Sequence, residues 1–494
     1  MTEEQFGIVE LYLKTNKYEV KQLNDLMSEY YSYYLYVLKH AKRQLKYLKR
    51  NRDRKRLLMQ LKRWHIAKYK PTKEQKKHNN DQLKEITKAY HIDSGFSFDK
   101  WVYNLDKDLH KHLASDVRKK VIAQVWVGIE TVLYGNGKKL GFTKFEDFTI
   151  VTATYTSPFK ITGNKFKIPK KKLSFTLSPF DDYRKKIFDN NEPRYIRLVQ
   201  KHKKNHTDYA IQVTYKGSVP INGRKVGSNE SLGLDIGPSS YAYVTDNEAR
   251  LGGLFPESDT YDKKIKALQI KMSRSDAMMN PDAFESTPKG HKYIKGHKLR
   301  HSNNWYKMKR ELRYLYRLKS VARKIKFETM ANTLIAHTGN IKMEKLSISG
   351  WQAGLFGKSI GNNAPSMLME IIKRKLSYHD LEPMIINTNK AKLSQLHHDT
   401  GEVEKAQLSE RSKYIAGEHV QRDLYSAWLA SHVTDDGFTV RNDIGELFDG
   451  FIELQANAIE YLYEHENVQL DSFGLKKTNF TTKSKLALDK QVVS

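Results

Sequence analysis

The most constraining stretch of this sequence is Ser231-Leu-Gly-Leu-Asp-Ile-Gly237, where apolar residues alternate with small or polar ones. A period of two is typical of a strand with one buried face, here formed by Leu232, Leu234 and Ile236. The other face carries one carboxylate, Asp235, between glycines that would let a bulky polyanion and its metal ions come close. The pattern predicts a metal ligand at Asp235. The alternative is an ordinary acid at the end of a buried strand.

The charge of the chain indicates its partners. Lys and Arg number 86 against 56 Asp and Glu in 494 residues, a formal charge of +30, which attracts polyanions and favours nucleic acid. No apolar run approaches the roughly 20 residues of a membrane-spanning helix, and the first residues lack the pattern of a signal peptide. We therefore expect a cytoplasmic protein that does not bind membranes. Cysteine is absent, so any metal is left to carboxylates, histidines and water.

The first part of the chain predicts a strand, a helical region and a β domain. Ile8–Leu13 alternates as a strand that pairs with strands much later in the sequence, and residues 20–70 have helical periodicity. The tyrosines among residues 30–36 either stack on bases or form core, and the basic helix face either binds nucleic acid or is solvated. From about 145 to 216 short alternating runs predict strands with a basic rim. The nucleic-acid-binding candidates here are Lys42, Arg43, Lys46, Arg50, Arg54, Lys165, Lys167, Lys170, Lys171 and Lys172.

The second part continues with strands at Ser240–Thr245 and about Arg250–Leu254, then a polar segment, 273–304, expected to be irregular and mobile. A basic helix from Trp305 to about His337 ends at Gly339. Later expectations are a strand with Glu344 at its end, a helix at 364–376, a strand at 383–388, a helix opened by 421–423, a helix at about 444–466 and a fraying tail after Leu470. Further nucleic-acid-binding candidates are Lys309, Arg310, Arg313, Arg317, Lys373 and Arg374.

Three carboxylates on separate elements suggest one site. Asp235 and Glu344 lie on predicted strands. Asp423 lies on a predicted helix with Ala427 and Ala430 on the same face, which would let the helix press against a sheet. Mg²⁺ prefers oxygen ligands, and two ions about 3.5–4 Å apart can hydrolyse a phosphodiester. Taken singly, Glu344 could pair with lysines and Asp423 could be a first-turn helix acid.

These motifs resemble TnpB, the transposon-encoded RNA-guided nucleases, and the compact type V CRISPR effectors related to them. Gly233-Leu-Asp-Ile-Gly237 resembles the first RuvC motif, Ile341-Lys-Met-Glu-Lys-Leu346 the second, and Arg422-Asp423 with Ala427 the third. The resemblance implies that Asp235, Glu344 and Asp423 are the catalytic and metal-binding triad, with two Mg²⁺ ions or possible Mn²⁺ replacements. It implies that Arg411, and with it Arg422, positions the strand being cut. For Arg411 a structural salt bridge is the alternative.

The implied fold is a multidomain α+β protein: an RNase H-like (RuvC) nuclease domain plus a basic β-barrel-like wedge domain interrupted by a helical recognition lobe. The expected divisions are 1–18 (first wedge strand), 19–140 (recognition), 141–230 (wedge), 231–386 (RuvC, with a helical insertion at 260–337), 387–419 (ribbon remnant), 420–470 (RuvC) and 471–494 (flexible tail).

The chain departs from this family where a four-cysteine zinc ribbon is common. Ser394-Gln395, Gly401, Leu408-Ser-Glu-Arg411 and Gly417 match the ribbon, but His397, Thr400, Lys413 and Ala416 stand in the cysteine positions. Thr, Lys and Ala cannot complete a tetrahedral zinc site. We expect a metal-free ribbon remnant without zinc. A rebuilt site from His397, His398, Asp399 and His419 is the alternative.

The resulting hypothesis is an RNA-guided DNA endonuclease that pairs a guide RNA with double-stranded target DNA beside a short flanking motif, displaces one strand and hydrolyses DNA. The gene would be bacterial, phage or carried by a mobile element, and the protein a monomer or a homodimer. One alternative is a guided DNA-binding regulator without nuclease activity. The other is an unguided, structure-selective RuvC-like nuclease or transposase.

Overall fold

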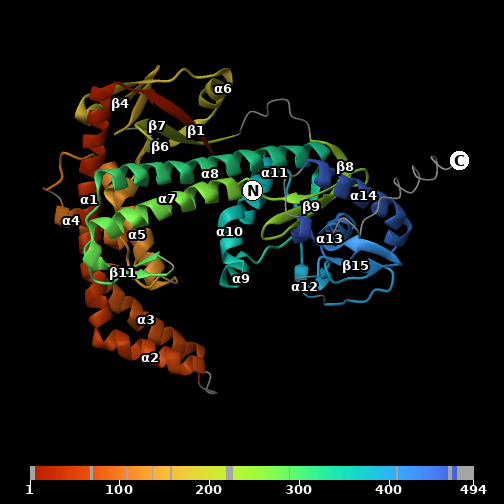
Figure 1. The fold of residues 1–494 in the computed structure, drawn as a ribbon. Coiled ribbons are helices and arrows are strands. Elements are labelled where there is room, and N and C mark those ends of the chain that lie inside the picture. Colours follow the sequence, from red (N-terminus) through yellow and green to blue (C-terminus); the bar gives the residue numbers. More distant parts are fainter. Residues whose placement is uncertain are drawn as a thin grey trace. The chain divides into compact units, whose positions relative to one another are not determined.

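The computed structural model describes residues 6–66, 71–106, 109–135, 137–155, 158–217, 226–288, 290–354, 356–405, 407, 410–465 and 470–475. The chain is a mixed α+β protein that divides into two compact units, Met1–Pro220 and Ile221–Ser494. Figure 1 shows the elements of each unit. Within the described ranges, no helix is long and apolar enough to cross a bilayer.

The first unit is built on a seven-stranded sheet with the order β2-β6-β7-β1-β5-β4-β3. Its strands are β1 (Phe6–Lys14), β2 (Ile150–Thr154), β3 (Lys160–Thr162), β4 (Lys165–Ile168), β5 (Leu173–Leu177), β6 (Glu192–His202) and β7 (Thr207–Lys216). Strand β1 pairs antiparallel with β7 and with β5. The prediction that the first strand pairs far along the sequence is therefore confirmed, and the helices between β1 and β2 are an insertion in this sheet.

Helices of the first unit are α1 (Lys17–Arg50), α2 (Arg52–Ile66), α3 (Lys73–Ala89), α4 (Gly95–Asp106), α5 (Ser115–Leu133) and α6 (Asp182–Asn190). The predicted long helical stretch breaks at Asn51, whose backbone N–H ends α1 and whose side chain accepts a hydrogen bond from the Arg54 N–H at the start of α2. Of the tyrosines on α1, Tyr30, Tyr33 and Tyr34 are buried in the core. The core interpretation of these three is confirmed, because helical spacing puts them on the inward face.

The second unit contains a five-stranded sheet with the order β10-β9-β8-β13-β14. The strands are β8 (Ser228–Ile236), β9 (Ser240–Val244), β10 (Ala249–Gly253), β13 (Thr338–Glu344) and β14 (Met384–Ile386). The first three are antiparallel, while β13 runs parallel to β8 and β14 parallel to β13. Gly339 lies inside β13 and does not end the preceding helix, which corrects that prediction.

Helices of the second unit are α7 (Ser258–Met279), α8 (Asn303–His337), α9 (Ile348–Ala353), α10 (Gly357–Asn363), α11 (Pro365–Ser377), α12 (Thr388–Ala391), α13 (Arg422–Ser431) and α14 (Phe448–His465). Two small hairpins, β11 (Phe284–Thr287) with β12 (Gly290–Tyr293) and β15 (Ser412–Ile415) with β16 (Glu418–Gln421), complete the unit. The segment predicted to be irregular, 273–304, is irregular at 294–302, whereas the rest includes the end of α7, the β11–β12 hairpin and the start of α8. Polar sequence there reflects an exposed helical hairpin rather than a lack of structure.

The end of the described chain also differs from prediction. The tail after Leu470 was expected to fray, yet Phe473 and Leu475 are buried in the core beside α14. The Leu475 N–H donates to the carbonyl of Leu470, and the Gln421 side chain donates to the Phe473 carbonyl. Two apolar side chains in a polar tail were enough to fix this segment. The rest of the predicted tail, 476–494, lies outside the described residues.

Candidate catalytic site and nucleic-acid interface

Asp235 and Glu344 end two neighbouring parallel strands. The register pairs Leu232 with Ile341 and Leu234 with Met343, so the residues that follow, Asp235 and Glu344, lie at the same level on the same face of the sheet. Both side chains are half-buried. The sheet thus brings together two acids that are more than a hundred residues apart in sequence.

Helix α13 lies directly against β8 because Gly233 has no side chain. A Cβ on Gly233 would lie 1.8 Å from the Ala427 carbonyl oxygen and 2.4 Å from the Ser431 backbone nitrogen. The prediction that small residues let this helix press on the sheet is confirmed. The reason given for Gly233 is wrong, since this glycine admits a helix and not a polyanion. The contact also orients α13, because it places the carboxyl-terminal half of this helix against Gly233.

Asp423 lies in the first turn of α13, one turn before Ala427, and its residue is 9% exposed. It lies close enough to Asp235 to affect that carboxyl group. Burial raises the pKa of Asp235 well above its usual value, and the negative charges of Asp423 and Glu344 raise it further. Burial also raises the pKa of Glu344. The three acids therefore form one electrostatically coupled cluster that binding of a cation would relieve.

Two arginines balance the charge of this cluster. The Arg411 Nη1 lies 3.7 Å from Asp423 Oδ2, and the Arg422 Nε lies 3.5 Å from Asp423 Oδ1. Both guanidinium groups lower the pKa of Asp235, whereas Asp423 and Glu344 raise it. Arg422 also donates to the Glu410 carbonyl, and its backbone N–H donates to the Arg411 carbonyl. Both residues predicted to position substrate therefore lie at the acids.

Lys342 is a site residue that sequence reasoning missed. It is 8% exposed and its Nζ donates to the carbonyls of Ser431 and Val433, at 3.1 and 2.6 Å, so it holds the carboxyl end of α13. Burial lowers the pKa of this amine. The alternation of β13 puts Lys342 on the same face as Glu344, which was the available signal. An ammonium at this end also complements the helix dipole.

The donor set fits a hard divalent cation. Carboxylate oxygens from β8, β13 and α13 are the ligands that Mg²⁺ prefers, and the charges of Asp423 and Glu344 both act on Asp235. In the described part of the chain, no group of three or more His, Asp or Glu side chains is gathered closely enough to hold an ion as placed. Asp423 is instead turned to Arg411 and Arg422. Binding an ion would require the carboxylates to move toward each other and away from these arginines.

The segment expected to be a ribbon remnant contains two tight turns. In the first, Gly401 has φ of 72° and its N–H donates to the His397 carbonyl, and in the second Gly417 has φ of 85°. The two turns are joined by hydrogen bonds, from the Lys413 Nζ to the Leu396 carbonyl (3.0 Å) and from the Ala416 N–H to the Asp399 carboxylate (3.1 Å). Leu408 and Ser409 lie outside the described residues.

The histidines of the ribbon are bound to other groups. His398 contacts the Tyr425 hydroxyl at 2.8 Å, and burial lowers the pKa of this imidazole and that of His419. His397 lies 3.4 Å from Glu404. Tyr425 comes from α13, and its ring lies 4.5 Å from the Lys413 Nζ. The ribbon is thereby fastened to the helix that carries Asp423. The alternative of a rebuilt site at His397, His398, Asp399 and His419 gains no support among the described residues.

Helix α1 presents part of a basic groove of about 330 Å³ in the first unit. It is lined by Lys42, Leu45, Lys46, Lys49, Arg50, Lys139 and Leu140. Three of the predicted nucleic-acid-binding residues, Lys42, Lys46 and Arg50, therefore share one concave surface, to which Lys49 and Lys139 add charge. Arg43 is exposed nearby with its guanidinium over Tyr47, whereas Arg54 is half-buried. Arg54 is the least available of the five candidates on α1 and α2.

The other basic candidates divide by their contacts. Lys165 and Lys172 are exposed and Lys167 is half-buried. The Lys170 Nζ donates to the Leu113 carbonyl, at 2.9 Å, and to that of Lys111, while Lys171 pairs with Glu29. Arg374 is paired with Glu328 at 2.6 Å, and Lys373 with Glu370 at 4.0 Å. On α8, Arg310 is exposed and Lys309, Arg313 and Arg317 are half-buried.

Comparisons with known proteins give remote similarity only. No family model and no curated protein matches this chain. A Cas12f1–sgRNA–target DNA complex is 12% identical, covers 86% of this chain and 98% of its own, and has a TM-score of 0.42. A CRISPR–Cas12f ternary complex is 12% identical, covers 88% of this chain and 100% of its own, and has a TM-score of 0.30. Because both TM-scores are low, we infer function from the residues of this chain.

Proposed function

We propose that this protein is an RNA-guided DNA endonuclease with Asp235, Glu344 and Asp423 as its catalytic carboxylates. The observation that carries the proposal is the coupled acid cluster, assembled from β8, β13 and α13 in a chain of charge +30. The strand order supports assignment of the second unit as RNase H-like (RuvC): three antiparallel strands are followed by two parallel ones. The first and fourth strands each carry an acid, and a helix packs across them.

Asp235, Glu344 and Asp423 would hold the divalent cations, Mg²⁺ or Mn²⁺. When bound, such a pair supplies activation of a water molecule and stabilisation of the leaving oxygen. Arg411 and Arg422 neutralise Asp423 while no cation is bound. If the carboxylate turned to a cation, these guanidinium groups would be available to a phosphate of the cut strand, a partner that arginine suits. Lys342 keeps α13, and so Asp423, in place.

We propose the remaining partners from the motif resemblance and the basic surfaces. Guide RNA would bind the α1 groove and the exposed lysines of the β rim in the first unit, which would be a wedge domain interrupted by a recognition lobe. Base pairing would select a double-stranded DNA target, and the protein would hold backbones and the displaced strand. No zinc is needed for this role. The protein would act in a bacterial cytoplasm as a monomer or homodimer.

The first test is to purify the protein from cells carrying its native flanking DNA and to sequence the bound RNA. We expect one abundant RNA with a constant scaffold and a variable end. DNA matching that end should then be cut in Mg²⁺ by the wild type and by Asp449→Ala, an exposed acid of α14 away from the cluster. Asp235→Ala should bind RNA and target equally well and cut at least about a thousandfold more slowly, since it removes a ligand needed for the reaction.

Other outcomes select the alternatives. Cutting by Asp235→Ala at the wild-type rate would contradict the assignment of the site. Target binding without cutting by the wild type would support a nuclease-silent regulator. If only random cellular RNA copurifies, and protein stripped of nucleic acid cuts DNA at an undiminished rate, the protein is an unguided nuclease.

A further inference from the structure

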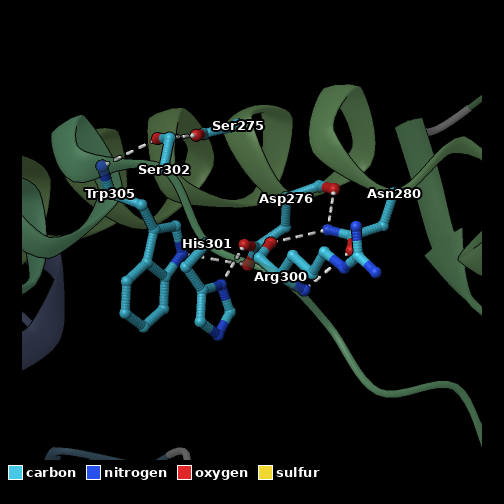
Figure 2. Close-up of polar contacts among 7 residues, drawn as sticks. All are labelled: Ser275, Asp276, Asn280, Arg300, His301, Ser302 and Trp305. Atoms are coloured by element: carbon cyan, nitrogen blue, oxygen red, sulfur yellow. Dashed lines mark hydrogen bonds and ion pairs between the residues drawn. The ribbon is translucent and has the colours of Figure 1, made fainter.

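The tip of the α7–α8 helical hairpin carries a built cluster that the proposed catalytic role does not use. It consists of Ser275, Asp276, Asn280, Arg300, His301, Ser302 and Trp305, all within the second unit (Figure 2). Most of it falls in the segment that the sequence predicted to be irregular. In Figure 1 the hairpin extends away from the sheet of its own unit, with β11 near its tip. The tip cluster is thus distant from the acids on β8 and β13.

Asp276 fixes the aromatic side chains of the tip cluster. Its carboxylate contacts the His301 Nδ1 at 2.7 Å and accepts a hydrogen bond from the Trp305 Nε1 at 3.0 Å. The His301 and Trp305 rings are stacked, with centroids 3.7 Å apart and planes 11° from parallel. One carboxylate therefore locks two rings as a single platform. Figure 2 shows both rings on the same side of the helices, with Trp305 on α8 and His301 in the segment just before it.

The backbone around the platform is fixed by two further contacts. The Asn280 side chain donates to the Arg300 carbonyl and accepts from the Arg300 N–H, at 2.8 and 2.7 Å. The Ser302 hydroxyl caps α8 by accepting from the Trp305 N–H and lies 3.1 Å from the Ser275 hydroxyl. None of these bonds uses a ring atom of His301 or Trp305. They therefore do not explain why the two rings stack at the tip.

One exposed aromatic side chain lies beside the platform, and another lies on the β11–β12 hairpin at the same tip. Tyr306 is 46% exposed and meets the Trp305 ring edge-on, with centroids 5.3 Å apart. Tyr293, on β12, is 41% exposed. The Lys309 Nζ lies 5.3 Å from the centre of the Trp305 ring. Rigid aromatic faces beside cations are the usual means of holding unpaired bases.

The charge of the tip favours nucleic acid over a protein partner. Within 281–310, leaving out residue 289, six exposed side chains are basic: Lys292, Lys295, Lys298, Arg300, Lys307 and Arg310. The same described residues include only two acids, Asp282 and Glu285. A nucleic acid supplies both a phosphate for such a surface and a π-face for the rings. An apolar protein surface would leave the six cations without counter-charges.

We propose that the Trp305–His301 platform stacks an unpaired base of a single-stranded nucleic acid, whose phosphates contact the surrounding lysines and arginines. The class of ligand rests on the proposed function, but the stacking requires neither a guide nor catalysis. Asp276 is a positioning residue in this site, because it holds both rings at the angle needed for stacking. The test below measures binding and is unaffected by whether Asp235 is catalytic.

The test uses full-length protein stripped of nucleic acid and three labelled strands of equal length: single-stranded RNA, single-stranded DNA and abasic DNA. Binding is followed by fluorescence anisotropy at high salt, which weakens phosphate contacts. Trp305→Ala should bind the base-containing strands about tenfold more weakly and abasic DNA unchanged. Trp305→Phe should stay within about threefold of wild type because it keeps an aromatic face. Tyr316→Ala, an exposed aromatic further along α8, is the matched control.

Tryptophan fluorescence gives a local reading of the same site. Base-containing strands should quench wild-type emission more than they quench Trp305→Phe, and abasic DNA should produce no such difference. If Trp305→Ala weakens binding of single-stranded RNA alone, the site is assigned to RNA. If it weakens binding of both single-stranded RNA and single-stranded DNA, the site accepts any unpaired base. Equal binding of all three strands by wild type and folded Trp305→Ala would overturn the proposal. So would equal weakening with abasic DNA, which would assign the cluster a purely structural role.

Discussion

At the scale of single residues, the acid cluster depends on residues that do not carry its chemistry. Gly233 sets the separation of α13 from β8, and Lys342 holds the far end of the same helix. Gly233 and Lys342 together set the position of Asp423, because Asp423 lies in the first turn of this helix. The site is therefore sensitive to changes that leave all three carboxylates in the sequence.

Gly233→Ala should displace α13, because its Cβ would lie 1.8 Å from a backbone oxygen that cannot rotate away. We expect a loss of about 1–3 kcal/mol in the free energy of unfolding, as for other overpacked cores, and slower DNA cutting. Denaturant unfolding and a cleavage assay measure the two effects. Gly450→Ala is the control, since a Cβ there meets nothing within 4 Å and alanine favours a helix. Wild-type stability in Gly233→Ala would contradict the packing described here.

Lys342→Met should leave the carbonyls of Ser431 and Val433 without their buried donor. Methionine fills similar space, so the expected cost of about 1–3 kcal/mol comes from the lost hydrogen bonds. Cutting should fall while RNA binding stays unchanged, because the affected helix carries Asp423. Thermal unfolding, a cleavage assay and RNA binding are measured together, with Lys358→Met, an exposed lysine of α10, as the control. If Lys342→Met unfolds and cuts as the wild type does, the amine does not hold α13.

At the scale of elements, the two turns of residues 387–419, the segment expected to be a ribbon remnant, are held by side-chain and backbone contacts. Both turns retain a glycine at positive φ, Gly401 and Gly417, which other residues adopt at a cost. The hydrogen bonds of Lys413 and Asp399 join the turns where the resemblance would have placed zinc. Tyr425 then ties the ribbon to α13. The element thus supports the acid site by contacts between side chains and backbone.

A variant that combines His397→Cys, Thr400→Cys, Lys413→Cys and Ala416→Cys should bind zinc. The turns are already bent, so four thiolates would be brought near one point with tetrahedral coordination available. Metal analysis of the purified variant should give about one zinc per chain. The matched control keeps Thr400 and carries the other three changes, which should lower zinc affinity sharply. Equal zinc content in both variants would show that the turns do not face one another as a ribbon.

The pH dependence of stability should reveal Lys413. Burial lowers the pKa of its amine to about 8 in the folded protein, against about 10.4 when unfolded. Between these values the unfolded chain holds the extra proton, so the free energy of unfolding rises with pH through this window. Lys413→Met lacks this gain. Urea unfolding at several pH values should show that the free energy of unfolding of the wild type rises relative to that of the variant from about pH 8 to 10.5. A constant difference would contradict the depressed pKa.

At the scale of the whole molecule, the net charge of +30 acts through particular surfaces. The triple variant Lys42→Gln, Lys46→Gln, Arg50→Gln should weaken RNA binding for all sequences and reduce the salt dependence by about one counterion per removed contact. Binding curves at several salt concentrations measure this. Lys170→Gln is the control, because its amine is bonded to backbone carbonyls inside the unit. An equal change in salt dependence for both would show that the groove is not the contact surface.

Much of the fold follows from local patterns. The alternation of β1 and β8, the helical spacing of the α1 tyrosines and the small residues of α13 predicted the elements and their inward faces, because burial selects a periodicity that is visible in one segment. The helix and strand residues within 273–304 and the ordered chain end at 471–475 were mispredicted. Their folding depends on Asp276 meeting Trp305 and on Phe473 meeting a core, contacts that no local pattern contains.

The sequence by itself determined the charge, the absence of cysteine chemistry and the acids offered on β8, β13 and α13, since these are properties of residue type and spacing. Only the tertiary structure decided that Asp235 lies level with Glu344, that Gly233 receives α13, that Lys342 holds it, and that Lys170 and Arg374 have internal partners. The physical reason is that register, close approach and burial of a charge arise between segments distant in the chain. Their free energies depend on the partner and not on the residue alone.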